Sequence, residues 1–320
     1  KINYDILNKN KFNINFQTLK LEYKNGYNVL FIKEYYPVEI IGAGSFGLVL
    51  NVIKIKTGQK MAVKIIAKNN TNLDSDYLNK EVKILNSLDN PRIMKIYDIL
   101  DNTEYFFIFM ELIEGGNLKD LIIKRYLDKN VYLFRDSECS QIMKGIFESL
   151  NYLHKNNIIH RDINPKALSL ESDGKIKFIY LGFWKYYKNN KKHIPFKFYK
   201  KIIGKNFLFG SINNLMGVEL SRRDDLQSLA YMLIYFIKGN LPWDNIDIKS
   251  SEKRMEKILE MKLNIDDDIL TERLPKDIKM FLSYVKKLKF EEEPNYDYLK
   301  NILKNIINLK DSDKNYYFNL

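Results

Sequence analysis

The chain has 320 residues, of which 45% are hydrophobic and 13% aromatic, and this composition excludes a wholly disordered protein. Its 52 Lys and Arg against 40 Asp and Glu give a net charge of +12, which favours acidic partners without choosing among nucleic acid, membranes and proteins. The single cysteine, Cys139, excludes an intramolecular disulfide and a cysteine-rich zinc site, and it fits a reducing compartment. No apolar run reaches the roughly 18 residues of a membrane-spanning helix, so no membrane insertion is expected.

The first third of the sequence predicts an antiparallel sheet. Strands over 19–24 and 27–32 flank Asn25-Gly26, a pair typical of a two-residue hairpin turn. Three more strands are predicted over 38–41, 48–53 and 61–66. A helix over about 74–88 follows, and then two strands over 94–100 and 105–112.

After Gly115-Gly116 the pattern becomes mostly helical. Ser137 is placed to cap a helix that runs to about Asn156, whose apolar residues recur at helical spacing. A strand-rich start and a helix-rich remainder predict an α+β protein with two lobes and a hinge near 111–116.

A glycine-rich loop with the pattern G-x-G-x-x-G-x-V lies at Gly42, Gly44 and Gly47. Glycines let a backbone approach phosphates closely and offer N–H donors. A strand and not a helix follows the loop, which argues against a dinucleotide-binding βαβ unit. The next strand carries Lys64, which can reach nucleotide phosphates, and Glu81 on the following helix can hold that lysine. A plain hairpin with an exposed lysine and an exposed glutamate is the structural alternative.

The segment Ile159-His160-Arg161-Asp162-Ile163-Asn164-Pro165 resembles the catalytic loop of eukaryotic protein kinases, and the glycine loop fits the same pattern. The second half of the chain is most similar to the casein kinase 1 family. The similar runs are Ser211-Ile212-Asn213, Gly217-Val218-Glu219, Ser221 to Leu226, Leu241-Pro242-Trp243 and Lys289 to Leu299.

The resemblance implies an α+β, bilobal protein kinase fold. It implies an N-terminal extension with a β-hairpin over 1–34 and a small lobe over 35–112, made of an antiparallel sheet and one main helix. A larger, mainly helical lobe over 113–320 would carry the features similar to casein kinase 1.

Several catalytic positions of the kinase pattern carry unsuitable residues. The resemblance places the catalytic aspartate at Asp162, the neighbouring lysine at Asn164, and the two protein ligands of magnesium at Ala167 and Tyr180. Alanine offers no ligand atom, and a phenol with a pKa of about 10 is a poor magnesium ligand near pH 7. Because phosphoryl transfer depends on positioning and on neutralising phosphate charge, we expect a pseudokinase without a metal, in which Asp162 is a remnant of the base.

A weak, metal-independent ATP site is expected beside this degenerate catalytic loop. Ser169 stands where the family usually has a leucine below adenine, and the smaller polar side chain should weaken nucleotide binding. The resemblance assigns nucleotide contacts to Gly42, Gly44, Gly47, Val49, Ala62, Lys64, Glu81, Glu111, Ile113 and Ser169.

The segment from Lys185 to Phe209 interleaves lysines with large apolar side chains. Such a mixture suits a surface that attracts an acidic protein partner by charge and anchors it by aromatic burial. Packing of these side chains beneath the segment is the alternative. The expected role is a cytoplasmic scaffold or allosteric regulator, with association to the cytoskeleton or nucleus left open.

Two other functions stay open at this point. One is a divergent active Ser/Thr kinase of the casein kinase 1 type, since Lys64, Glu81 and Asp162 remain. The other is a basic structural protein on an acidic surface such as microtubules or nucleic acid, with nucleic acid the less favoured.

Overall fold

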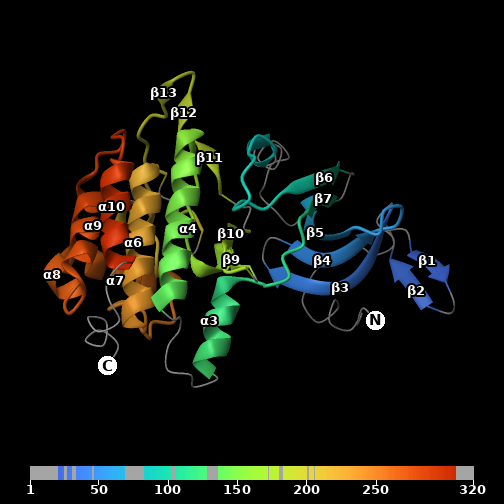
Figure 1. Ribbon diagram of the computed structural model, residues 1–320, viewed down its shortest axis with the longest axis horizontal. Coiled ribbons are helices and arrows are strands. Elements are labelled where there is room, and N and C mark those ends of the chain that lie inside the picture. The colour runs from blue at the N-terminus through green and yellow to red at the C-terminus, as the bar shows by residue number, and fades with distance from the viewer. Residues whose placement is uncertain are drawn as a thin grey trace. The chain divides into compact units, whose positions relative to one another are not determined.

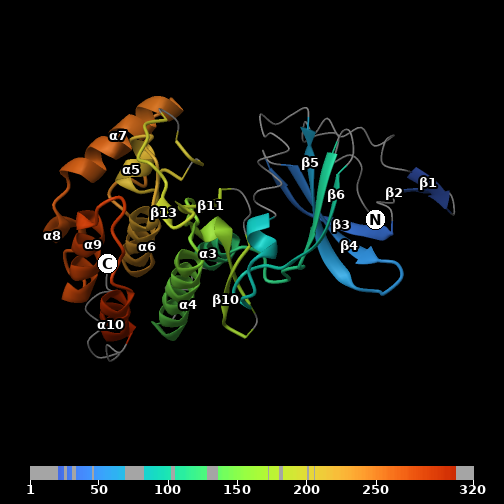
Figure 2. The ribbon, with the colours of Figure 1, turned by 90° about the horizontal axis from the view of Figure 1, so that it is seen from above.

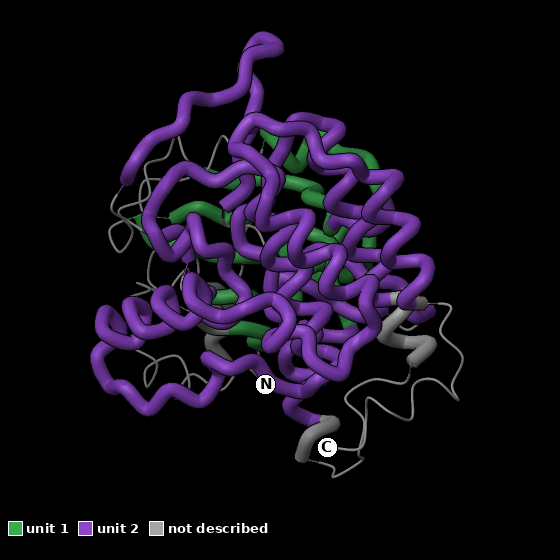
Figure 3. The backbone as a smooth tube through the Cα atoms, turned by 90° about the vertical axis from the view of Figure 1, so that its left-hand side faces the viewer, with its two compact units in different colours: residues 1–90, 94–114 green, residues 91–93, 115–320 purple. Residues whose placement is uncertain are grey.

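A computed structural model describes most of the chain. The described residues are 21–24, 27–30, 34–44, 47–68, 83–101, 105–127, 136–171, 173–179, 183–199, 202–204 and 206–307. They fold into two compact units (Figure 3): unit 1 spans 1–90 and 94–114, and unit 2 spans 91–93 and 115–320. Residues 91–93 belong to unit 2 because Phe178 N donates to Arg92 O at 2.8 Å and Ile93 bridges to Phe178 in parallel.

Unit 1 is built on a five-stranded antiparallel sheet with the strand order β3-β4-β5-β7-β6 (Figure 2). The strands are β3 (Tyr35–Gly44), β4 (Gly47–Lys54), β5 (Lys60–Ala67), β6 (Ile96–Asp101) and β7 (Tyr105–Met110). A separate antiparallel pair is formed by β1 (Leu21–Lys24) and β2 (Tyr27–Leu30). Of the helix predicted over 74–88, only its last part lies within the described residues, and residues 83–86 are helical.

β-Branched, aliphatic and aromatic side chains fill the core of this sheet, as β propensity favours. Every residue of β7 is buried, and its Phe109 ring stacks on Tyr35 with ring centroids 3.9 Å apart. The core cluster comprises Tyr35, Leu48, Leu50, Val52, Met61, Val63, Ile65, Tyr105, Phe107 and Phe109.

The third glycine of the G-x-G-x-x-G loop is required by the sheet itself. Gly47 has φ +121°, and a Cβ built on it would lie 2.0 Å from Ile65 O on the neighbouring strand. No side chain fits at that distance. The glycine at this position therefore has a structural reason independent of any phosphate.

Unit 2 is mainly helical. Its helices are α3 (Leu118–Leu127), α4 (Asp136–Lys155), α5 (Ile212–Leu215), α6 (Arg222–Lys238), α7 (Ser251–Asn264), α8 (Asp267–Leu270), α9 (Lys276–Lys287) and α10 (Tyr296–Ile307). Short strands are β8 (Ile158–Ile159), β9 (Leu168–Leu170), β10 (Ile176–Phe178), β11 (Lys185–Tyr186), β12 (Lys188–Asn189) and β13 (Lys192–His193), and η2 (Pro165–Ala167) is a 3-10 turn. The buried helix α6 packs against α4 and α9 (Figure 1).

The predicted α+β class with a small antiparallel sheet and a larger helical part is confirmed. One predicted boundary is wrong by two residues, because a cap at Ser137 predicts a helix from residue 138, whereas α4 spans Asp136–Lys155 and includes Ser137. Among the residues described, no helix is long and apolar enough to cross a membrane.

Candidate functional site

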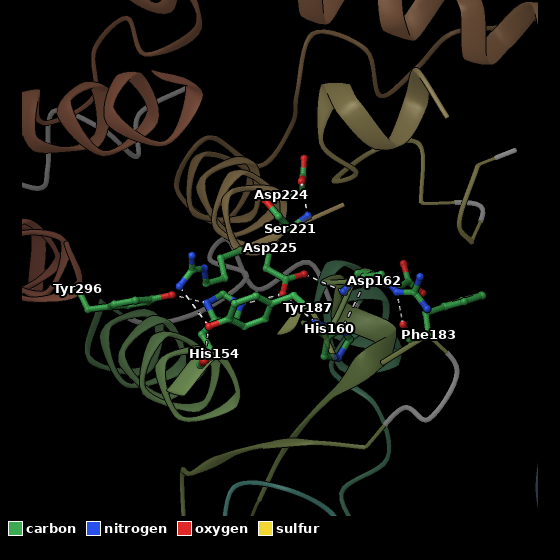
Figure 4. Close-up of polar contacts among 11 residues, drawn as sticks. His154, His160, Asp162, Phe183, Tyr187, Ser221, Asp224, Asp225 and Tyr296 are labelled. Atoms are coloured by element: carbon green, nitrogen blue, oxygen red, sulfur yellow. Dashed lines mark hydrogen bonds and ion pairs between the residues drawn. The ribbon is translucent and has the colours of Figure 1, made fainter. Parts of the chain in front are cut away.

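The loop that follows β8 is held by a buried carboxylate from the first turn of α6 (Figure 4). Asp225 accepts hydrogen bonds from His160 N at 2.8 Å through Oδ2 and from Arg161 N at 2.7 Å through Oδ1. Arg161 has φ +68°, a left-handed conformation that is costly for a side chain with a Cβ. The two hydrogen bonds to one carboxylate stabilise that conformation and fix the backbone from which the Asp162 side chain projects.

A histidine and a tyrosine lie behind this carboxylate. His154 at the end of α4 lies 2.9 Å from Asp225 Oδ2 through Nε2 and 2.5 Å from the Tyr296 hydroxyl of α10 through Nδ1 (Figure 4). Burial by itself would raise the pKa of Asp225, but the hydrogen bond and charge of His154 hold that pKa below its ordinary value. Three elements distant in sequence, α4, α6 and α10, thus hold one loop.

His160 packs as a neutral side chain within unit 2. Its ring lies 4.9 Å from Phe178 and 5.4 Å from Trp184, and its Nδ1 accepts from Asp162 N at 3.2 Å. Burial lowers the pKa of His160 to about 4, so the ring carries no charge near pH 7. Its role is to shape the loop.

The carboxyl group of Asp162 is nearly covered. The residue is only 8% exposed, and its Oδ1 has no hydrogen-bond partner among the described residues. A Cβ built on Gly204 would lie 3.4 Å from Asp162 Cγ, so the backbone of the following segment closes over the carboxyl group. Burial raises the pKa of Asp162 to about 6, although the amides of Asn164 and Asn206 and the charge of Lys166 act to lower it.

Asn164 and Ala167 are both committed to the backbone of this loop. The Asn164 side chain donates to Asp162 O at 2.9 Å and accepts from Lys166 N at 2.9 Å, capping η2. Ala167 is fully buried, with its N donating to Asn164 O at 3.0 Å. The alanine has no side-chain atom that could hold a metal, and the asparagine amide has one hydrogen bond at each of its two polar atoms.

Ser169 occupies the middle of β9, opposite Lys177 of β10. It is fully buried, and its hydroxyl has no hydrogen-bond partner among the described residues. A Cβ built on Gly115 would lie 2.7 Å from Leu170 O and 3.4 Å from Ser169 Oγ. A buried hydroxyl without a partner is costly, which makes Ser169 a polar defect in an otherwise apolar strand.

In unit 1, the register of the sheet brings several predicted nucleotide contacts together. Val49 pairs directly with Lys64 on one side and with Gly42 on the other. Residues opposite one another share a face, and faces alternate along a strand, so Ala62 lies on the same face as Lys64. Gly44 pairs with Gly47 at the closed end of the same ladder.

The end of β7 is tied to the strand before it. Glu111 N donates to Lys95 O at 2.9 Å, and the Glu111 carboxylate accepts from Lys95 N at 3.2 Å. Ile113 follows as a partly buried residue outside any strand. The remaining predicted residues, Glu81 and Tyr180, lie outside the described part of the chain, as do Lys200, Lys201 and Lys205.

The segment around Gly204, which covers Asp162, is held in place by the amide side chains of Asn206 and Asn214. Asn214 accepts from Ile203 N at 3.0 Å and donates to Ile203 O at 3.0 Å. Asn206 donates to Ile163 O at 2.9 Å and accepts from Phe209 N at 3.1 Å, so it joins this segment to the catalytic-type loop.

A buried lysine completes this attachment, and the sequence analysis missed it. Lys262 of α7 is fully buried and donates to Phe207 O, Leu208 O and Gly210 O at 2.9, 3.1 and 2.6 Å. Its ammonium group also lies 4.7 Å from the ring centre of Tyr231. Burial lowers its pKa, while three acceptors match the three N–H groups of an ammonium ion.

A signal for Lys262 was present in the sequence. It follows the buried Ile258 by four residues, which places it on the apolar face of α7. His154 carries the same signal, four residues after Leu150. A polar residue at an apolar helical position indicates a buried partner, but the spacing alone does not name it.

The run Ser211-Ile212-Asn213 has a contact that explains its polar residues. Ser211 Oγ and Asn213 Nδ2 donate to the same oxygen of buried Asp224, at 2.8 and 2.9 Å. The other carboxylate oxygen accepts from Ser221 N at 2.8 Å (Figure 4). This arrangement anchors the end of the segment on the start of α6.

A comparison with protein families agrees with this arrangement. A family model described as protein kinase domain matches residues 35–313, most of the chain.

Proposed function

The chain belongs to the protein kinase domain family, and on that premise we propose that it is a catalytically impaired member that acts as a scaffold or allosteric regulator. The proposal covers the likeness to casein kinase 1 in the second half of the chain. A cytoplasmic location is part of it, supported by the single cysteine, which fits a reducing compartment.

The observation that carries the proposal is the state of Asn164 and Ala167. In the family pattern, a lysine and a metal-binding asparagine stand at these positions. Here the amide of Asn164 donates to Asp162 O and accepts from Lys166 N to cap η2, and Ala167 is a fully buried methyl group. Asp225 keeps the backbone of the loop in shape, while the lysine ammonium group and the metal-binding amide of the family pattern are both absent from it.

Magnesium does not fit the residues present. When bound, it would neutralise charge on the transferring phosphate. Ala167 has no ligand atom, and the phenol of Tyr180 is a poor one near pH 7.

A nucleotide itself fits better than the metal. Lys64 and Val49 lie side by side across β4 and β5, and Gly42 is the partner of Val49 on β3. A lysine beside a glycine-lined strand end suits phosphate. Ser169, with its buried unpartnered hydroxyl, replaces an apolar contact to the base, which supports weak binding.

A divergent active Ser/Thr kinase is the second candidate, and one observation favours it. A carboxyl group whose pKa lies near the working pH is suited to accept a proton, and the pKa of Asp162 is raised to about 6. The cover by Gly204 opposes this reading, because the carboxyl group is not open to a substrate hydroxyl.

The experiment is a phosphate-transfer assay on the full chain with labelled ATP, in magnesium and in manganese, with casein as acceptor. Asp162→Asn is the matched inactive variant. We expect wild type and Asp162→Asn to give the same background. Metal-dependent transfer that disappears in Asp162→Asn would overturn the proposal in favour of the active kinase.

A restoration variant tests the stated cause. Asn164→Lys combined with Ala167→Asn and Tyr180→Asp returns the family's groups to their positions. A gain of magnesium-dependent transfer in a folded variant would show that these three positions limit catalysis. Unchanged background in a variant that melts like wild type would assign the loss to another position.

A further inference from the structure

An exposed series of aromatic rings runs out from the core of unit 2. The ring of Phe198 lies 5.3 Å from Phe196, Phe196 lies 5.2 Å from Phe290, and Phe290 lies 4.6 Å from His193. The first two pairs are edge-to-face, a favourable aromatic geometry. We name Phe196, Phe198 and Phe290 the aromatic cluster.

The outer rings of the cluster are exposed to a degree that their packing does not explain. Phe198 is 72% exposed and Phe196 is 46% exposed. Leaving such a ring in water forfeits the free energy that burial would give. Neighbouring exposed aromatic residues of this kind mark interaction surfaces.

The backbone beneath these rings is fixed. Tyr199 N donates to Gly217 O and Glu219 N donates to Lys197 O, both at 2.8 Å. Side chains alternate along this extended segment: Tyr199 donates to Glu219 at 2.6 Å and stays partly exposed, and Phe198 on the other face is the most exposed of these rings. The exposed rings are therefore held in place before any partner arrives, which lowers the entropy cost of binding.

A lysine-rich hairpin stands beside the cluster. Strands β12 and β13 pair as Lys188 with His193 and Asn189 with Lys192, and the hairpin projects beyond the helices of unit 2 (Figure 1). The described residues 183–199 contain five lysines and no acidic residue. Lys185 is paired with Glu219 at 2.7 Å, whereas Lys188, Lys191, Lys192 and Lys197 form no salt bridge with another described residue.

The described end of the 185–209 segment, residues 206–209, is partly to fully buried. Phe209 is 5% exposed, and its ring lies edge-to-face with Tyr235. The carbonyl groups of Phe207 and Leu208 are bound by Lys262. Among the described residues of the segment, the exposed aromatic rings therefore lie between Tyr186 and Tyr199, and Phe290 beside them is partly buried.

We propose that the aromatic cluster and the lysine hairpin form a docking surface for an acidic protein segment that carries an apolar anchor. The anchor packs on Phe196 and Phe198, and flanking Asp or Glu side chains meet Lys191, Lys192 and Lys197. Charge gives attraction and orientation, and ring burial gives affinity. This inference deepens the proposed scaffold role and rests on it.

Acidic residues that follow Phe290 in the chain favour a protein over a nucleic acid as the partner. Glu291, Glu292 and Glu293 follow Phe290 and are exposed. A nucleic acid carries negative charge along its whole length and would be repelled at this end. A protein segment can place its acidic residues against the hairpin alone.

The experiment is selection of short random peptides, displayed on phage, against the full chain. We expect enriched peptides that combine an aromatic or large aliphatic residue with Asp or Glu. Their affinity, measured by fluorescence anisotropy at roughly 0.15 M salt, should fall about tenfold or more in Phe198→Ser. It should also fall in the triple variant Lys191→Glu, Lys192→Glu, Lys197→Glu.

Two matched control variants test whether peptide binding depends on this surface or merely on the net charge and on any exposed apolar side chain. Ile269→Ser removes an apolar side chain that is 65% exposed on α8, and Lys253→Glu, Lys276→Glu, Lys300→Glu reverses three exposed lysines elsewhere in unit 2. Both controls should bind the selected peptides like wild type. Selected peptides without acidic residues, no enrichment at all, or equal losses in the controls would overturn the inference.

Competition by an oligonucleotide tests whether the surface binds any polyanion. Binding of a single-stranded oligonucleotide that competes with the peptides and is insensitive to Phe198→Ser would show a general polyanion surface and reject the proposal. Phosphate transfer is measured separately, so an active enzyme would overturn the proposed function without deciding whether the peptides bind here.

Discussion

The imidazole of His154 and the carboxylate of Asp225 share a buried hydrogen bond of 2.9 Å, and that carboxylate carries the backbone of the loop that contains Asp162. The pair touches no position where phosphate chemistry would occur. It keeps the loop in shape whether or not the loop is catalytic. A protein of this family can therefore lose its reactive groups and retain its fold.

Asp225→Asn should destabilise the chain strongly. The amide keeps one acceptor where the carboxylate offered two, and its N–H group faces the N–H donors of His160 or Arg161. Breaking a buried charged network of this kind costs about 3 kcal/mol of unfolding free energy. Urea denaturation followed by circular dichroism measures it, with the exposed Asp173→Asn expected to leave the midpoint nearly unchanged.

The hydrogen bond between His154 and Asp225 should stabilise the fold more at neutral pH than in acid. Because the pKa of Asp225 is lowered on folding, its contribution is present at neutral pH and is lost as the pH falls below the ordinary aspartate value of about 4. The stability gap between wild type and Asp225→Asn should therefore narrow in acid. A gap that is constant from neutral to acid pH would contradict the assignment.

Asp162 should show the opposite dependence. Its pKa is raised to about 6 in the folded chain, so its stabilising contribution is full below the unfolded value of about 4 and is lost as the pH rises through 6. Relative to Asp162→Asn, wild type should lose up to about 3 kcal/mol of unfolding free energy between pH 4 and pH 7. Denaturant midpoints of both proteins across this range measure it, and parallel curves would show that the carboxyl group is not buried.

Lys262→Met should loosen the segment that covers Asp162. The apolar side chain fits the space but leaves the carbonyl groups of Phe207 and Gly210 without their side-chain donor, while Leu208 O keeps its hydrogen bond from Trp243. Unpaired buried carbonyl groups cost about 1–3 kcal/mol each before relaxation. Hydrogen exchange should speed up across 206–210.

The matched control for Lys262→Met lies on the same helix, α7. Lys257 is exposed, and Lys257→Met should leave exchange over 206–210 unchanged. Equal exchange in both variants would mean that Asn206, Asn214 and Trp243 hold the segment without Lys262. Trp243 donates to Leu208 O at 2.8 Å and is the strongest competitor for that role.

ATP should raise the melting temperature slightly, and EDTA should leave that rise intact. Binding to the folded state alone stabilises it by mass action, and Ala167, at one of the two magnesium-ligand positions of the family pattern, offers no ligand atom. Lys64→Met should abolish the rise, whereas the exposed Lys60→Met on the same strand should keep it. A large rise that requires magnesium would show a metal site formed by other residues.

The sequence by itself determined the class of the fold and the order of the strands of unit 1. Short apolar runs between turn residues mark β4 and β5, and helical spacing marks α4, because such patterns depend only on neighbours along the chain. It also located Asp162, Asn164 and Ala167, since they lie within one short motif. The glycine pattern was visible too, but its reading as a phosphate loop left out the demand that Ile65 O places on Gly47.

Only the tertiary structure decided what those residues do. Gly204 closes over Asp162, and Lys262 binds three carbonyl groups, through contacts between segments far apart in sequence. The cap that Asn164 forms on η2 is local, but the motif alone does not show it. The same holds for the segment from Lys185 to Phe209, in which Phe209 is buried and Phe198 is exposed although both lie in one basic, aromatic run. Burial and hydrogen-bond partners are properties of the packed chain, and no local pattern of residue types specifies them.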